Sequence, residues 1–219
     1  MRTPVDKPRY WDEATRSLAR RDRTMRRLIR AYPDVHLKRR SDPFTTLARA
    51  VVGQQISVRA ADAIWRRFVV TVAPGGKPAA FPRLAPDVVA VVAMEELRAC
   101  GLSERKALYL RDLAVHFASG ALDPKRWRRI DDEALIAALV DVKGIGRWTA
   151  EMFLIFHELR ADVLPVDDIG LQRAMALHYF AGERPTPAQM RNVAAAWQPW
   201  RSVATWYLWR SLDPVPVEY

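Results

Sequence analysis

The chain has 219 residues, of which 50% are hydrophobic, enough to bury the core of one large domain or of two closely packed lobes. Its 35 basic and 25 acidic residues give a formal charge of +10, which suits a polyanionic partner because each neutralised phosphate releases counterions. Cys100 is the single cysteine, which excludes a disulfide within the chain and a cysteine-ligated zinc or iron–sulfur centre.

The first residues lack the apolar run of a signal peptide, and no apolar stretch is long enough to span a bilayer. We therefore expect a protein of the cytoplasm, associated with the nucleoid if its source is bacterial, without a membrane partner.

Apolar residues recur at helical spacing through most of the chain. This spacing predicts a helix over about residues 11–31. Asp42 followed by Pro43 predicts another helix start, because it combines a capping side chain with a proline in the first turn. That helix is expected to continue to about Val72, and the run Pro74–Pro78 predicts a loop or lobe boundary after it.

Val88–Val92 is the only strand-like run, and no second strand is available to pair with it. We therefore predict an all-α fold without internal repeats. The other expected helices are Met94–Cys100, a helix from the cap Ser103 to Ser119, a helix capped by Asp131 over 132–142, one beginning near Gly146, and three at about 168–180, 187–197 and 201–211.

The most informative segment is Leu139–Ala150, in which a helix ends, a Gly144-x-Gly146 turn follows, and a second helix begins at once. Glycines at this spacing let the backbone approach a ligand and adopt positive φ, so that the amides of the turn and of the new helix can bind an anion. Lys143 and Arg147 add positive charge on either side. A Gly-x-Gly turn alone is also common as an ordinary helix cap.

This segment resembles the hairpin of the helix-hairpin-helix DNA glycosylase superfamily. It continues in the same way, through a second helix to a short loop and an acidic residue within 162–168. Three further blocks resemble the alkylpurine branch of that superfamily (3-methyladenine DNA glycosylase II): Val52–Ser57, Gly101–Leu110 and Trp200–Trp209. The resemblance covers about residues 43–211.

The resemblance implies a two-lobed helical fold with the active site in the cleft between the lobes. We expect a single glycosylase unit over 1–219, with lobe A at about 43–141 and lobe B formed by about 1–42 together with 142–219. The sheet-containing domain that precedes these lobes in the familiar enzyme is expected to be absent.

The resemblance also implies a function in base excision repair. The expected enzyme is a monofunctional glycosylase that flips an alkylated purine (3-methyladenine or 7-methylguanine type) out of duplex DNA, hydrolyses its N-glycosidic bond and leaves an abasic site. Relatives that also nick the strand carry a lysine where this chain has Trp148, which cannot form a Schiff base. The alternatives are a glycosylase for ethenoadenine or a deaminated base, and a non-catalytic DNA-binding protein that keeps the hairpin.

In this family the reaction depends on an aspartate at the start of the helix after the hairpin. A fixed carboxylate stabilises the positive charge that develops on the sugar as the base departs. Asp167 and Asp168 are both candidates. Asp167 matches the family's spacing and is the predicted catalytic residue, while Asp168 could cap the helix instead.

Tryptophans are expected to line the base pocket, because electron-rich rings attract a cationic alkylated purine. Trp148 and Trp209 match pocket positions of the family, and Trp206 lies close in sequence. Met152 stands where some relatives have an aromatic residue, which leaves the lesion range open.

The predicted DNA contacts include Gln55, which occupies the family position that fills the gap left by the flipped base. The other reading is that Gln55 only bridges neighbouring loops. The predicted hairpin contacts are Lys143, Gly144, Ile145, Gly146, Arg147 and Thr149.

No metal or organic cofactor is expected to take part in bond cleavage. The resemblance suggests a monovalent cation, Na⁺ or K⁺, on hairpin carbonyls near Val140, Val142 and Ile145, where it would bridge to phosphate. The partner is expected to be duplex DNA with a damaged base, bound by a monomer.

Overall fold

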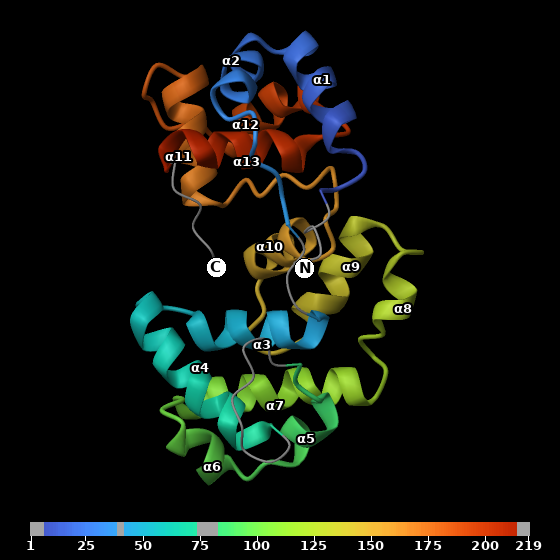
Figure 1. The fold of residues 1–219 in the computed structure, drawn as a ribbon, viewed down its shortest axis with the longest axis vertical. Helices are drawn as coiled ribbons and strands as arrows, with labels where there is room; N and C mark the ends of the chain where they lie inside the picture. Colours follow the sequence, from blue (N-terminus) through green and yellow to red (C-terminus); the bar gives the residue numbers. More distant parts are fainter. Residues whose placement is uncertain (1–6, 39–41, 74–82, 214–219) are drawn as a thin grey trace. The chain divides into compact units, whose positions relative to one another are not determined.

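The structure, a computed structural model, describes residues 7–38, 42–73 and 83–213, and every regular element in these ranges is helical (Figure 1). No β-strand occurs in these ranges, so the predicted all-α fold is confirmed. In the same residues, no helix combines the length and the apolar character needed to cross a membrane.

The chain divides into two compact units: a terminal unit of residues 1–39 and 154–219, and a central unit of residues 40–153. The second boundary falls within helix α10, Arg147–Phe156, whereas the expected lobes divided the chain at residue 142. The hairpin belongs to the central unit because it is bound there, for example by a hydrogen bond of 2.8 Å from Gln54 Nε2 to the Gly144 carbonyl.

The terminal unit joins the first helices of the chain to the last, coloured blue and red in Figure 1. Helix α13 packs against α1, α2 and α11, and its Val203, Tyr207 and Leu208 are buried in the core. The elements that lie wholly in this unit are α1 (Trp11–Arg21), α2 (Arg23–Ala31), α11 (Ile169–Tyr179), α12 (Pro187–Ala194), the 3₁₀ turn η2 (Ala195–Trp197) and α13 (Arg201–Leu212).

The single helix predicted over 11–31 is wrong, because the chain breaks at Asp22 into α1 and α2. Asp22 has an extended backbone, and its side chain accepts the Met25 amide at 3.0 Å as the N-cap of α2. The same carboxylate accepts hydrogen bonds of 2.9 Å from the Tyr179 hydroxyl and the Trp197 indole. These two distant donors stabilise a break that helical periodicity does not predict.

The central unit is organised around α7, which packs against α3, α5 and α6 and buries Leu110 and Leu113 completely. Three predicted caps are confirmed, since Asp42, Ser103 and Asp131 each accept an amide of the first turn. The helices of this unit are α3 (Pro43–Gly53), α4 (Val58–Val72), α5 (Pro86–Val91), α6 (Met94–Ala99), α7 (Glu104–Ala118), α8 (Pro124–Trp127), α9 (Asp132–Val140) and most of α10.

One expectation for this unit is corrected, and the strand-like run noted in the sequence takes the helical form that the predicted all-α fold requires. The helix expected to run from Pro43 to Val72 is interrupted at residues 54–57, where Ser57 caps α4 by accepting the Ala60 amide. The strand-like run Val88–Val92 belongs largely to α5, with proline in its first turn and Val89 completely buried. A helix satisfies its own backbone, whereas a lone strand has no partner. The predicted loop Pro74–Pro78 lies outside the described residues.

Candidate active site and nucleic-acid interface

The hairpin turn, residues 141–146, joins α9 to α10 through a tight backbone bend. The Ile145 amide donates to the Val142 carbonyl at 3.1 Å, and Gly144 has a φ of +83°. Gly146 is exposed and its backbone does not share this left-handed conformation. Positive φ is therefore required at the first glycine of the predicted pair and not at the second.

Gly144 also meets a steric requirement, because its backbone lies directly on the ring of Tyr109 from α7. A Cβ atom at this position would be 2.1 Å from the ring, well inside van der Waals contact. The Gly144 carbonyl accepts the side-chain amide of Gln54 at 2.8 Å. The Tyr109 ring and the side chain of Gln54, at the C-terminus of α3, therefore both hold the turn in place.

The two cations beside the hairpin turn have different surroundings. The Arg147 guanidinium binds Glu133 through two hydrogen bonds of 2.9 and 2.5 Å and binds Glu151 at 3.0 Å. The hydrogen bond from Arg147 lowers the pKa of Glu133, while the bond to Glu133 raises the pKa of Arg147. The Lys143 side chain is 75% exposed, and its ammonium lies 3.8 Å from Asp112. Arg147 therefore braces α9 against α10, and Lys143 is the more accessible cation.

The other predicted hairpin contacts differ in what they expose. Ile145 and Thr149 are buried as whole residues, at 3% and 9% exposure, so neither presents its side chain to a phosphate. The Val142 carbonyl accepts the Ile145 amide, while the structure gives the carbonyls of Val140 and Ile145 no hydrogen bond from a described residue. Carbonyl oxygens of this kind suit a hard cation, so the turn fits the predicted Na⁺ or K⁺.

The predicted wedge residue lies in the loop between α3 and α4, residues 54–57, which we call the wedge loop. Gln55 is exposed and has a φ of +57°, a left-handed conformation that is uncommon outside glycine. Ile56 and Val58 beside it are 37% and 68% exposed. The loop and the first residue of α4 thus present Gln55 together with two apolar side chains to solvent.

Helix α10 carries Trp148 and Met152 one turn apart, so they share one face of the helix with Phe156 a turn further on. Trp148 is 47% exposed and Met152 is half-buried. Phe156 was not among the predicted site residues, although its i, i+4, i+8 spacing from Trp148 was a readable signal. Trp148 and Met152 belong to the central unit, and Phe156 belongs to the terminal unit.

In the terminal unit, Phe156 joins two predicted tryptophans and one of the two candidate aspartates. The Phe156 ring stacks on Trp209 with centroids 5.6 Å apart and lies edge-on to Trp206 at 6.1 Å. The Trp209 indole donates to Asp168 Oδ1 at 2.8 Å. We call Phe156, Asp168, Trp206 and Trp209 the aspartate–aromatic cluster.

The two adjacent aspartates differ in their contacts. Asp168 is the N-cap of α11, where its Oδ1 accepts the Leu171 amide at 2.6 Å in addition to the Trp209 indole. Asp167, the predicted catalytic residue, is exposed. Gly170 lies so close to this corner that a Cβ atom there would be 3.1 Å from Asp168 Oδ1 and 3.2 Å from Trp209.

Hydrogen bonds from side chains of the terminal unit hold the loop that carries both aspartates. The Gln172 amide donates to the Val166 carbonyl at 2.9 Å, and its oxygen accepts two hydrogen bonds from Arg184, at 3.1 and 2.8 Å. The Asp168 amide donates to the Pro165 carbonyl at 3.0 Å. The Asp168 carboxylate therefore lies on a loop with few alternative conformations.

Sequence reasoning missed Arg210, which lies one turn after Trp206 on α13. Its guanidinium is 4.6 Å from the centre of the Trp206 ring, and the residue is 3% exposed. Its Nε and Nη1 atoms are buried without a hydrogen-bond partner among the described residues. One ring of the cluster thus already contacts a cation from the protein.

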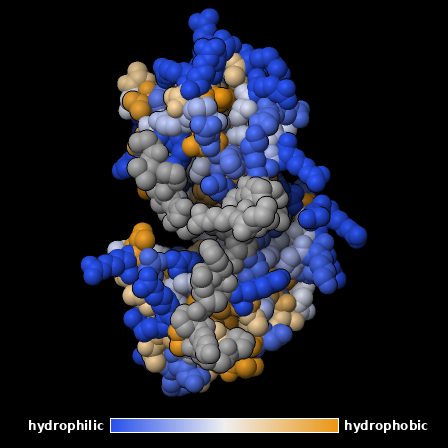
Figure 2. All heavy atoms as spheres, in the orientation of Figure 1, coloured by the Kyte–Doolittle hydropathy of each residue, from blue (hydrophilic) through white to orange (hydrophobic). Residues whose placement is uncertain are grey.

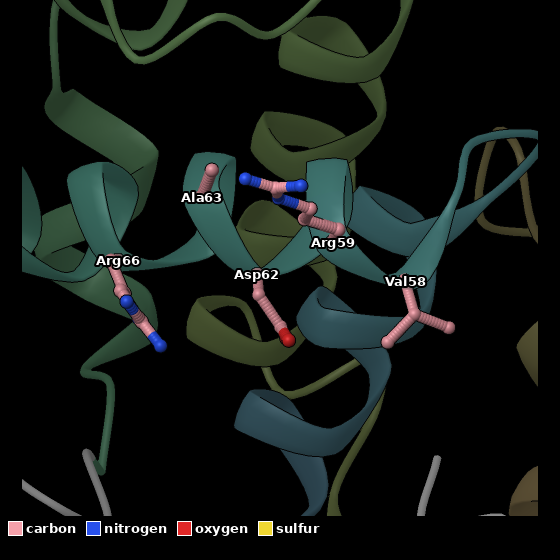
Figure 3. Close-up of a pocket in the computed structure, with 5 residues that line it drawn as sticks. All are labelled: Val58, Arg59, Asp62, Ala63 and Arg66. Atoms are coloured by element: carbon pink, nitrogen blue, oxygen red, sulfur yellow. The ribbon is translucent and has the colours of Figure 1, made fainter.

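A further hollow lies on the surface of the central unit. Figure 3 shows a shallow hollow on α4 lined by Val58, Arg59, Asp62, Ala63 and Arg66, none of which is a predicted site residue. Asp62 there is paired with Arg49. Figure 2 shows hydrophilic side chains over α1 and α2, consistent with the basic composition of those helices. The described residues contain no group of three or more potential metal-ligating side chains.

Residues 48–200 match the family described as the HhH-GPD superfamily base excision DNA repair protein. DNA-3-methyladenine glycosylase 1 of Schizosaccharomyces pombe is 34% identical over 194 residues, which cover 87% of this chain and 82% of that protein. The resemblance to this superfamily and to its 3-methyladenine branch is thereby confirmed.

Solved structures agree with this result. A DNA-3-methyladenine glycosidase from Bacillus halodurans has a TM-score of 0.83 and 33% identity, over 97% of this chain and 93% of that one. The 3-methyladenine DNA glycosylase of Schizosaccharomyces pombe in complex with abasic DNA has a TM-score of 0.76 and 32% identity, over 94% and 98% of the two chains. The chain belongs to the HhH-GPD superfamily of base excision DNA repair proteins.

Proposed function

We propose that this protein is a 3-methyladenine DNA glycosylase that removes alkylated purines from duplex DNA during base excision repair. The observation that carries the proposal is the aspartate–aromatic cluster, which joins a fixed carboxylate to stacked rings through the Trp209–Asp168 hydrogen bond of 2.8 Å. The relatives that are similar over most of this chain bear the name of that activity. Binding to DNA alone needs no such cluster.

The reaction requires a negative charge that stays in place while positive charge develops on the sugar. Asp168 suits this role because two N–H donors hold its carboxylate, one from α11 and one from Trp209. Asp167, which the sequence favoured, is exposed and lies just outside the helix. We therefore assign the catalytic carboxylate to Asp168 and keep Asp167 as the alternative that the experiment tests.

The enzyme is proposed to be monofunctional. The hydrolysis needs only a water molecule as nucleophile, and the family position of the strand-nicking lysine is held by Trp148, whose indole cannot form a Schiff base. Base release then leaves an intact strand with an abasic site.

Aromatic faces provide the preference for a cationic base. A cation over an aromatic ring gains about 0.5–2 kcal/mol, depending on how fully it is desolvated. In this chain Arg210 already lies over Trp206, so within the terminal unit we assign the selection of the base to Trp209 and a supporting role to Trp206. Trp148, in the central unit, stays a predicted pocket residue. Because Arg210 is itself positive, neutral lesions such as ethenoadenine form the second candidate substrate class.

Duplex DNA is the proposed partner, bound by one copy of the protein. The hairpin turn is proposed to bind phosphate through its backbone amides and Lys143, with Na⁺ or K⁺ on the carbonyls of Val140, Val142 and Ile145. Gln55 is proposed to fill the gap that the flipped base leaves. The proposed cation would bridge the hairpin turn to phosphate and would take no part in cleavage of the N-glycosidic bond.

The test incubates the purified protein, in EDTA, with a duplex carrying alkylated purines, and measures free base and alkali-labile sites. Wild type, Asp168→Asn and Asp167→Asn are assayed together. The proposal expects release of 3-methyladenine or 7-methylguanine, strand breaks only after alkali, and loss of release in Asp168→Asn. Loss in Asp167→Asn alone would return the role to Asp167. Tight binding without release from any alkylated, etheno or deaminated duplex would indicate a non-catalytic DNA-binding protein.

A further inference from the structure

Lys106 is a half-buried lysine of α7 whose ammonium group binds protein carbonyls. Its Nζ atom donates to the carbonyls of Val52 and Gln54, at 2.8 and 2.7 Å. These carbonyls lie at the C-terminus of α3, where backbone acceptors lack partners within the helix. Burial lowers the pKa of Lys106, as expected for an ammonium withdrawn from water. Lys106 thus holds the point at which the wedge loop leaves α3.

The same short stretch of the chain also contacts the hairpin turn. The side chain of Gln54 donates to the Gly144 carbonyl at 2.8 Å. Tyr109, which follows Lys106 by three residues and so lies on the same face of α7, packs against Gly144. All these residues belong to the central unit. One face of α7 therefore supports both the wedge loop and the hairpin turn, and Gln54 connects the two.

The backbone of Gln55 makes this support necessary. A non-glycine residue with a φ of +57° persists where surrounding contacts determine the conformation. Gln55 is exposed, so its own side chain does not supply those contacts. The neighbouring residue Gln54 supplies them, since its carbonyl binds Lys106 and its side chain binds Gly144.

We propose that Lys106 is a positioning residue that sets the conformation of Gln55 and, through Gln54, joins the wedge loop to the phosphate-binding hairpin turn. The proposal rests on the intrusion of Gln55 described under the proposed function. Phosphate binding at the hairpin turn and entry of Gln55 into the duplex then occur together, since the two segments share the bond from Gln54 to Gly144. Lys106 acts through carbonyls and does not count among the cations that bind phosphate.

The experiment compares Lys106→Met and Gln54→Leu with the matched control Arg105→Met, which removes an exposed charge from the adjacent position of the same helix. Two properties are measured on each protein without any base release. One is the salt dependence of binding to undamaged duplex. The other is the fluorescence of 2-aminopurine placed beside an abasic-site analogue, which reports unstacking. Gln55→Ala shows how much of the signal depends on intrusion.

For Lys106→Met we expect the unstacking equilibrium to fall about 10-fold, the order expected when hydrogen bonds to a charged group are lost. The salt slope should stay at the wild-type value. Gln54→Leu should reduce unstacking in the same direction, and Lys106→Arg should restore part of it by reaching the same carbonyls.

Two results would overturn the proposal. A salt slope reduced by about one with normal unstacking would make Lys106 a phosphate contact. Normal unstacking together with a normal slope would remove any role in intrusion. A general loss of folding is recognised by thermal unfolding and by equal losses in both assays, and Gln54→Leu, which keeps the lysine, then decides the question. Because neither assay needs base release, failure of the glycosylase proposal would be detected separately.

Discussion

The hairpin turn and the aspartate–aromatic cluster recognise their proposed targets with different parts of the chain. The hairpin turn uses backbone, whose shape is set by a left-handed glycine lying on Tyr109. The cluster uses side chains, in which rings and a carboxylate contact one another from three separate segments. Changes in the first region should therefore act through shape and on binding. Changes in the second should act on chemistry while binding persists.

The largest expected effect is in the cluster. Asp168→Asn keeps an N-cap residue for α11, so the fold should be retained. Loss of the negative charge should reduce the single-turnover rate of base release on the order of 100-fold or more. Binding to an abasic-site analogue should change little. Asp167→Asn is the matched control and should stay within about 3-fold of wild type, as typical surface substitutions do. Equal losses in the two variants would contradict the assignment.

The corresponding change in the hairpin turn is Gly144→Ala. A methyl group there meets the Tyr109 ring and also a positive φ, so we expect roughly 2–4 kcal/mol of lost stability and weak DNA binding. Gly146→Ala provides the control for folding stability, because no atom beyond its chain neighbours lies within 4 Å of the added Cβ. Denaturant unfolding and a binding titration measure both variants. Similar behaviour of the two alanine variants would show that the shape of the turn is not decisive.

Trp209→Phe separates stacking from hydrogen bonding within the cluster. The phenyl ring can still stack on Phe156, but the donor to Asp168 is lost. Removing one hydrogen bond to a charged group should slow base release about 10-fold, with DNA affinity unchanged. Trp206→Phe, which keeps a ring under Arg210, should have the smaller effect. If Trp206→Phe released base more slowly than Trp209→Phe, the hydrogen bond from Trp209 to Asp168 would not be the important contact.

The smallest effect distinguishes the two cations of the hairpin. Lys143→Met should lower the salt slope of DNA binding by about one, because this side chain is accessible to phosphate. Arg147→Met should leave the slope near the wild-type value and should instead lower the thermal stability, since it removes the bonds to Glu133 and Glu151. If Arg147→Met lowered the salt slope and Lys143→Met did not, Arg147 would have to leave Glu133 and Glu151 and bind phosphate in the DNA complex.

The ion pair also has a pH signature. Because Arg147 lowers the pKa of Glu133 in the folded state, the pair stabilises the fold above the ordinary carboxyl pKa, and this stabilisation is lost as pH falls through the lowered value. Unfolding measured between about pH 3 and pH 6 should show this acid-side loss in wild type and less of it in Arg147→Met. Glu133 is largely exposed, so the difference should be small.

Local chemistry determined much of the fold. Asp42, Ser103 and Asp131 cap helices through contacts made within a few residues, so the sequence predicts them well. Side chains from other segments decided the rest. Asp22 interrupts a helix because Tyr179 and Trp197 bind its carboxylate, and Val88–Val92 becomes helical where Val89 is buried. Neither event is encoded in the spacing of nearby apolar residues.

The site divides in the same way. The sequence by itself determined the glycine turn, the tryptophans and the superfamily, because these depend on residue identity at fixed spacing. Only the tertiary structure brought the Trp209 indole to Asp168, bound Arg147 to two glutamates and placed Arg210 on Trp206. These are contacts between side chains far apart in the chain. Their strength depends on distances of a few ångströms, which appear only once the helices have packed.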